Sequence, residues 1–148
     1  MKLYLNDVTA TERLGAALAQ HLRTRRRGVV YLEGDLGAGK TTLARGFLRA
    51  LGVEGAIRSP TYTLIEPYRV GEQELLHLDL YRLNSPDELL NLGLSDYPSD
   101  RCIWLLEWPQ RGEGRIPRPD VRVILQHEGD RRSAVVEGVP AVELATMA

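Results

Sequence analysis

The segment Gly34–Thr41 reads GDLGAGKT and contains the residue types needed to hold a chain of phosphates. It matches the spacing G-x-x-x-x-G-K-[ST], in which glycines let the backbone wrap closely and point its N–H groups at phosphate oxygens. A helix beginning directly behind the loop would add the positive end of its dipole. In this pattern Lys40 is expected to reach the β- and γ-phosphates, and the Thr41 hydroxyl to bind Mg²⁺.

Two acidic residues are candidates for completing a magnesium site, which in such enzymes uses an acid at the end of a neighbouring strand. Glu107 follows the apolar run Ile103–Leu106, as expected of a buried strand that ends in an acid. The alternative for Glu107 is a surface acid at a strand end. Asp79 lies in the more alternating segment HLDLYRL. It is either a site residue, near the metal or orienting the attacking water, or the partner of Arg82 in a structural salt bridge.

Three further features allow both a functional and a structural interpretation. Ser59–Thr63 carries three hydroxyls and a phenol around a proline, which suits either a switch loop over the γ-phosphate or an edge strand. Trp108 could stack on a base or fill the core. The run Arg23–Arg27 favours the C-terminal end of a helix dipole, with an RNA or partner contact as the alternative.

The predicted helices and strands must position these residues. Val29–Leu32 is a short apolar run that predicts a strand covered on both faces, directly before the loop. A helix is predicted from Lys40 to Leu51 behind the loop, and another from the N-cap candidates at Asp7–Thr11 to about Arg25. A further helix is expected to start at Ser85. Other strands are expected at Lys2–Leu5, Tyr62–Tyr68, Glu74–Leu80, Cys102–Leu106, Val121–His127 and Ser133–Val139.

The order of these elements predicts an α/β fold, a three-layer P-loop NTPase domain with a mixed, partly antiparallel sheet. The first half of the chain is expected to supply the parallel strands, and hairpins at 62–80 and 121–139 to add antiparallel ones. A length of 148 residues predicts one domain spanning residues 1–148. The pattern does not define the strand order.

Composition narrows the class of protein. The net charge of −1 argues against a polyanion binder as a whole. Lys2 and Lys40 are the only lysines, and neither fits a guanine-reading [NT]-K-x-D motif, so ATP is favoured over GTP. The single cysteine, Cys102, cannot form a disulfide within the chain, which fits a reducing compartment. Without an apolar signal segment or membrane span, the sequence predicts a cytoplasmic protein that does not contact a membrane.

The motifs GDLGAGKTT, SPTYTLIEPY, HLDLYRL followed by SPDEL, LGLSDY and LLEWPQRGEG together resemble one family in order and spacing. The resemblance is to TsaE (older name YjeE), the bacterial ATPase for threonylcarbamoyladenosine formation in tRNA, and extends over most of the chain. It implies that ATP phosphates are bound by Gly37, Ala38, Gly39, Lys40, Thr41 and Thr42.

The resemblance also implies roles for residues outside the loop. Mg²⁺ would be bound by Thr41 and Glu107, Asp79 would be essential for turnover, and Thr61 would lie in a switch-like loop near the γ-phosphate. Trp108 would neighbour the nucleotide. The adenine would lie along Thr9 and Thr11, and Arg131 or Arg132 would also reach the nucleotide.

In the family, ATP hydrolysis is slow for the isolated protein and is stimulated by the partner pair TsaB and TsaD. Hydrolysis resets that complex between rounds of tRNA modification, so contact with tRNA is indirect. Two other classes use the same loop: a small-molecule kinase, which passes the γ-phosphoryl group to an acceptor, and a nucleotide-dependent binding module that barely hydrolyses ATP.

Overall fold

A computed structural model of the chain describes residues 1–145. The sheet has seven strands in the order β1-β7-β6-β2-β5-β4-β3. Its strands are β1 (Lys2–Leu5), β2 (Gly28–Glu33), β3 (Ile65–Val70), β4 (Gln73–Asp79), β5 (Cys102–Glu107), β6 (Val121–Glu128) and β7 (Arg131–Glu137). The α-helices are α1 (Val8–Arg23), α2 (Lys40–Ala50) and α3 (Ala141–Ala145), and the 3₁₀ helices are η1 (Pro86–Asn91), η2 (Leu94–Asp96) and η3 (Pro109–Gly112).

The sheet is mixed, with its parallel strands at the centre. β2 pairs in parallel with β5 and β6, and β4 pairs in parallel with β5. The outer pairs β1/β7, β6/β7 and β3/β4 are antiparallel. The expectation that the first half supplies the parallel strands holds only for β2 and is otherwise wrong, whereas the expectation that the two hairpins add antiparallel strands is confirmed. Each hairpin instead gives one inner parallel strand and one outer strand, which must run antiparallel because a hairpin reverses the chain.

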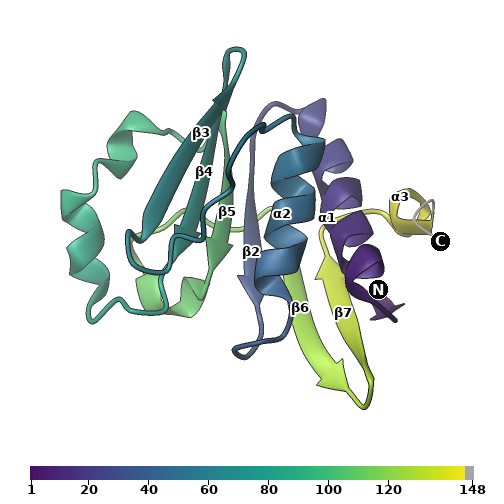
Figure 1. Cartoon of the computed structure of the whole chain (residues 1–148). Helices are drawn as coiled ribbons and strands as arrows, with labels where there is room; N and C mark the ends of the chain where they lie inside the picture. The colour runs from purple at the N-terminus through teal and green to yellow at the C-terminus, as the bar shows by residue number, and fades with distance from the viewer. Residues whose placement is uncertain (146–148) are drawn as a thin grey trace.

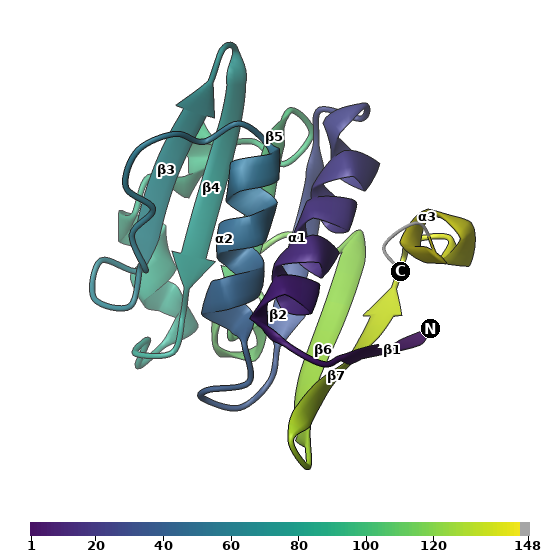
Figure 2. The ribbon, with the colours of Figure 1, turned by 45° about the vertical axis from the view of Figure 1, so that its right-hand side comes forward.

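α1 and α2 lie side by side across one face of the sheet (Figures 1 and 2). The leucines that recur along α1, Leu14, Leu18 and Leu22, are buried there together with Phe47 of α2. Among the described residues, the structure contains no helix long and apolar enough to cross a bilayer.

Within residues 1–145 the opposite face of the sheet is covered without an α-helix, so the expected third layer consists of 3₁₀ helices and loops instead of α-helices. Leu83 and Leu89 pack there with Trp104 of β5, in a second apolar cluster. The helix expected from Ser85 is the 3₁₀ helix η1, and the Ser85 side chain forms a capping box with Glu88. Strands alternate their side chains between the two faces, so the parallel strands are buried on both.

Two glycines bring α1 and α2 unusually close. A Cβ on Gly15 would lie 2.3 Å from the Leu43 carbonyl oxygen, and a Cβ on Gly46 would lie 2.3 Å from that of Glu12. Only glycine at both positions permits this backbone approach, because an added methyl group would overlap the facing carbonyl. The contact fixes where α2 lies over the sheet, and therefore where its first turn lies.

The strand expected at Tyr62–Tyr68 begins only at Ile65. Residues 60–63 form a turn, in which the Leu64 N–H donates to the Pro60 carbonyl at 2.8 Å. Leu64 itself has a φ of 67°, a left-handed conformation in which an extended strand cannot continue. The edge-strand interpretation of Ser59–Thr63 is therefore wrong, and this segment is a loop.

Candidate functional site

The carboxyl ends of β2, β4 and β5 meet at one edge of the sheet, because these three strands are parallel. β2 ends at Glu33, and the glycine-rich loop leads directly from it into α2. Asp79 and Glu107 are the last residues of β4 and β5 and are direct Cα partners in the sheet. Ligand sites of open α/β sheets lie outside this edge.

A cavity of about 440 Å³ opens at this edge. Its lining residues come from the glycine-rich loop, α2, the Ser59–Thr63 loop, the ends of β4 and β5 with the residues that follow them, and β7: Leu36, Gly37, Gly39, Lys40, Thr41, Thr42, Thr61, Asp79, Tyr81, Arg82, Glu107, Trp108 and Arg132. The cavity therefore brings together most of the residues singled out in the sequence, although they lie far apart along the chain.

The loop before α2 depends on glycine backbone conformations. Gly37 and Gly39 have φ values of 79° and 110°, which other residues rarely adopt. Gly39 is also the N-cap residue of α2 and offers no side-chain acceptor to the first turn of the helix. Ala38 is buried, and its N–H donates to the Asp35 carbonyl at 3.1 Å. The uncapped first turn, with the dipole of α2 behind it, favours an anion at this position.

Lys40 is buried at the floor of the loop, with 5% of its surface exposed. Its Nζ donates to the Gly34 carbonyl and lies 3.9 Å from the centroid of the Trp108 ring. Burial lowers the pKa of Lys40, and the nearby carboxylates of Glu107 and Asp79 oppose this shift. Within residues 1–145 the Lys40 ammonium forms no ion pair within 4.0 Å. It is held by neutral groups and can therefore pair with an incoming anion.

Asp79 is buried beside this lysine and is hydrogen-bonded on both oxygens. Its Oδ1 accepts from the Tyr81 N–H at 3.1 Å, and its Oδ2 accepts from the Thr61 hydroxyl at 3.5 Å. Burial raises the pKa of Asp79, and the carboxylate of Glu107 raises it further. The alternative salt bridge to Arg82 is not formed in the described part of the chain, where Arg82 lies 4.5 Å from the centroid of the Tyr62 ring.

Glu107 is buried and contacts His77, a residue that no sequence motif singled out. Its Oε2 lies 2.8 Å from Nε2 of His77, and both side chains are almost fully inaccessible to solvent. The surface-acid interpretation of Glu107 is therefore wrong. His77 could have been found from HLDLYRL, because residues two apart in a strand point to the same face and Asp79 was already a candidate.

Trp108 lines the cavity and also packs against the second apolar cluster. Its backbone is in the left-handed region at φ 55°, an uncommon conformation for a large residue that often occurs at functional sites. The indole packs at 5.0 Å from the ring of Tyr81, measured between centroids, and the cations of Lys40 and Arg111 lie 3.9 Å and 5.7 Å from the centroid of its ring.

The remaining predicted residues lie around the cavity or away from it. Arg132 lines the cavity, and its guanidinium donates to the Gly37 carbonyl at 3.4 Å. Arg131 points elsewhere and lies 4.0 Å from the centroid of the Tyr4 ring. Thr9 is exposed, and Thr11 is buried with its hydroxyl donating to the Asp7 carbonyl at 3.4 Å. Neither threonine lines the cavity, so their nucleotide contacts stay predictions.

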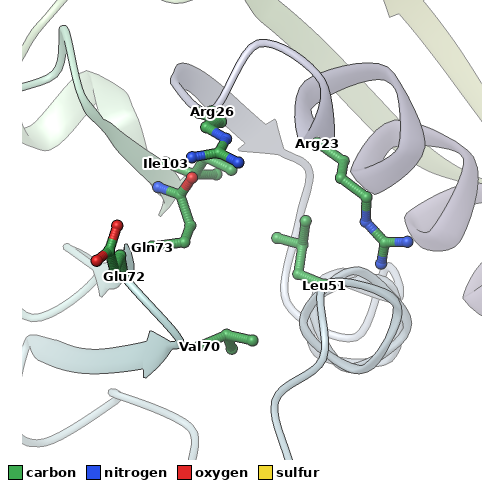
Figure 3. A pocket seen from close by; sticks show the side chains of 7 residues that line it. All are labelled: Arg23, Arg26, Leu51, Val70, Glu72, Gln73 and Ile103. Carbon is green, nitrogen blue, oxygen red and sulfur yellow. The ribbon is translucent and has the colours of Figure 1, made fainter.

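A separate hollow of about 440 Å³ lies at the opposite end of the parallel strands (Figure 3). It is lined by Arg23, Arg26, Leu51, Val70, Glu72, Gln73 and Ile103. Arg23 reaches across from α1 and donates to the Ala50 carbonyl at the end of α2. This contact is with a different helix, whereas Arg25 donates to the His21 carbonyl in the last turn of α1, which supports the interpretation of the run as cations at a helix C-terminus.

Comparison with known proteins agrees with this architecture. A family model described as "Threonylcarbamoyl adenosine biosynthesis protein TsaE" matches residues 5–134. The tRNA threonylcarbamoyladenosine biosynthesis protein TsaE of Haemophilus influenzae is 42% identical over 133 residues, which cover 88% of this chain and 84% of that protein. The protein of the same name from Synechocystis is 43% identical over 118 residues, covering 75% and 71% of the two chains.

The crystal structure of Bacillus subtilis YdiB superposes on this chain with a TM-score of 0.75. The two sequences are 26% identical, and the match covers 99% of this chain and 93% of YdiB. The same mixed α/β fold therefore extends over nearly the whole length of both proteins. Together with the family match over residues 5–134, this identifies the chain as a member of the TsaE family of threonylcarbamoyl adenosine biosynthesis proteins.

Proposed function

We propose that this protein is a Mg²⁺-dependent ATPase of the P-loop type that serves threonylcarbamoyladenosine formation in cytoplasmic tRNA. The observation that carries the proposal is the position of Lys40. Its buried ammonium has no acidic partner within 4.0 Å among the described residues, and it lies beside a glycine-rich loop and two buried carboxylates. Burying an ammonium group without a direct ion pair is costly, and the nearby carboxylates offset this only in part, so the site is suited to an anionic substrate.

The described residues fit a triphosphate in three respects. Glycine conformations at Gly37 and Gly39 let the backbone approach phosphate closely. The first turn of α2 has no side-chain cap, so its N–H groups remain available as donors. Lys40 supplies the positive charge. We propose that Thr42 completes the phosphate contacts, and that the Ala38 N–H joins it by exchanging its hydrogen bond to the Asp35 carbonyl for one to phosphate.

Thr41 and Glu107 would hold Mg²⁺. Hydroxyl and carboxylate oxygens are the ligands that this ion prefers, and both residues line the cavity. When bound, magnesium would neutralise charge on the β- and γ-phosphates during transfer. Glu107 stands at the end of a buried strand, so its carboxylate is held by the sheet and not by a surface loop.

Asp79 is the residue that we assign to the attacking water. The raised pKa of its buried carboxyl group makes it a better proton acceptor than an exposed aspartate. Its hydrogen bond to the Tyr81 N–H fixes the orientation of the group. Asp79 would orient the water and take its proton as the bond from water oxygen to the γ-phosphorus forms and the bond to the ADP oxygen breaks. The products are ADP and inorganic phosphate.

The loop that carries Thr61 links this chemistry to a partner. The Thr61 hydroxyl donates to Asp79, while the neighbouring Tyr62 side chain is 82% exposed. A protein that contacts Tyr62 would therefore shift Thr61 and, through it, Asp79. We propose TsaB and TsaD as the proteins that stimulate hydrolysis, with tRNA contacted only through that complex.

The test is a hydrolysis assay with and without a purified TsaB–TsaD complex. We expect slow phosphate release from the isolated protein and clear stimulation by the complex. Glu107→Gln should abolish both rates, whereas the matched control Glu113→Gln, which alters an exposed glutamate outside the cavity, should retain them. Absence of stimulation would overturn the partner assignment. With γ-labelled ATP and a metabolite pool, label appearing in an organic acceptor would favour the kinase alternative.

A further inference from the structure

We propose that His77 is a positioning residue for Glu107, which orients this carboxylate for Mg²⁺ by donating a hydrogen bond from Nε2 to Oε2. The inference deepens the proposed function and rests on it. It concerns the binding of Mg²⁺ to the protein–nucleotide complex, which precedes ATP hydrolysis.

The sheet places His77 at the boundary between the apolar core and the polar cavity. Side chains of alternate residues in β4 point to one face, so Leu75, His77 and Asp79 follow one another toward the cavity. Leu75 belongs to the apolar cluster beneath α1 and α2, and Asp79 lines the cavity. In the neighbouring strand, Leu105 is the Cα partner of His77, and Glu107 is the partner of Asp79. His77 therefore lies one layer below the two carboxylates, on the face that α2 covers.

The hydrogen bond between His77 and Glu107 is short and is shielded from solvent. The two atoms are 2.8 Å apart, and the side chains are 3% and 4% exposed. A hydrogen bond to a carboxylate is stronger in a buried site than in water, and it fixes the orientation of both groups.

The other ring nitrogen shows which tautomer is present. His77 Nδ1 is buried and has no hydrogen-bond partner among the described residues. A buried acceptor without a partner is tolerated more readily than a buried N–H without one. The ring is therefore protonated on Nε2, and it donates to Glu107. Oε1 of Glu107 accepts no hydrogen bond within residues 1–145 and remains as the oxygen for the metal.

Three substitutions at position 77 separate this role from simple packing. The amide nitrogen of Gln can occupy the place of imidazole Nε2 and donate to Glu107, whereas that of Asn reaches only the place of Nδ1. Leu fills a similar volume without any donor. The matched set is therefore His77→Gln, His77→Asn and His77→Leu, each first checked for folding by its thermal melting curve.

The measurement is calorimetric titration of Mg²⁺ into the protein–ADP complex, alongside titration of ADP without Mg²⁺. We expect His77→Leu and His77→Asn to weaken Mg²⁺ binding by about 10- to 100-fold, the range typical for loss of an outer-shell hydrogen bond. His77→Gln should restore most of the affinity. Binding of metal-free ADP should be the same in all four proteins, because His77 does not line the cavity.

Other results of these titrations would contradict either the role of His77 or the proposed function. Unchanged Mg²⁺ affinity in folded His77→Leu, or equal losses in the Gln and Asn variants, would overturn the positioning role. Should only His77→Leu fail to fold, the Gln and Asn pair still decides the question. Wild-type protein that binds ADP without any Mg²⁺ dependence would instead contradict the proposed function, and the inference would be lost with it.

Discussion

Asp79 and Glu107 face each other as Cα partners at the ends of two hydrogen-bonded parallel strands, and both carboxyl groups are buried. A neighbouring carboxylate disfavours the ionised form of a carboxyl group, and burial disfavours that form as well. Both effects raise the pKa of Asp79, with burial the larger cause. An ionised Asp79 is therefore unfavourable for folding, and a titratable group kept in such a position is typical of a functional site.

This relationship predicts how stability depends on pH. Because folding raises the pKa of Asp79 from its ordinary value of 3.8, the folded state binds this proton more tightly than the unfolded chain does. The contribution of the protonated Asp79 to the free energy of unfolding is complete below pH 3.8 and is lost as the pH rises through the pKa of the folded state. Asp79→Asn should therefore melt at a higher temperature than wild type at neutral pH, and the difference should disappear on acidification, while ATP turnover is lost.

Thermal melts of both proteins across the acidic range provide the measurement. Asn can still accept the Tyr81 N–H through its carbonyl oxygen, so the local turn is retained. Asp96→Asn is the matched control, because it changes an exposed aspartate outside the cavity. An Asp79→Asn variant less stable than wild type at neutral pH would contradict the argument.

Lys40→Ala should weaken ATP binding and abolish ATP turnover. The variant loses a charge-assisted bond to phosphate, which contributes about 1.5–3 kcal/mol, and a factor of ten in affinity corresponds to about 1.4 kcal/mol. ATP affinity should therefore fall by at least about tenfold. The chain offers a natural control in its other lysine, Lys2, which is exposed and paired with Glu128 at 2.7 Å. If Lys40→Ala bound ATP as well as Lys2→Ala does, the assignment of the cavity would be wrong.

Arg132 and Arg131 should behave differently although they are adjacent. Arg132 lies against the glycine-rich loop, and its Nε is buried without a hydrogen-bond partner in the described chain. Such a donor suits a bound phosphate oxygen. Arg131 lies over Tyr4 instead. We expect Arg132→Ala to weaken ATP binding about tenfold or more, the effect of one lost charge-assisted bond, and Arg131→Ala to have little effect. Fluorescence titration with an ATP analogue distinguishes them, and the reverse order would exclude this geometry.

Gly46→Ala should destabilise the protein by separating α2 from α1. An alanine in a helix normally gains about 0.5–1 kcal/mol over glycine, but the new Cβ would lie 2.3 Å from the Glu12 carbonyl oxygen. Overpacking of a core contact costs about 1–3 kcal/mol, so the net effect is unfavourable. Arg45→Ala, on the exposed side of the same helix, should change stability by less than about 0.5 kcal/mol. Urea unfolding of both variants measures the difference, and a more stable Gly46→Ala protein would disprove the close contact.

Sequence reasoning was most successful where a feature is local. The predicted strand Val29–Leu32 and the helix from Lys40 correspond closely to β2 and α2, because apolar runs and periodic leucines report burial directly. Prediction was weakest where one pattern allows two structures. The start at Ser85 has the caps of a helix, yet the segment forms a 3₁₀ helix, in which Leu89 packs in the cluster with Trp104 while Leu90 is 64% exposed.

The sequence alone determined the chemical groups of the site: a glycine-rich loop that ends in Lys40 and Thr41, and acids at Asp79 and Glu107. These follow from residue type and short-range spacing, which the backbone converts into local structure without help from distant parts of the chain. Only the tertiary structure decided that β4 lies beside β5, that Arg132 and not Arg131 lines the cavity, and that His77 holds Glu107. These relationships join residues remote in sequence, and they depend on strand order and register, which local patterns do not encode.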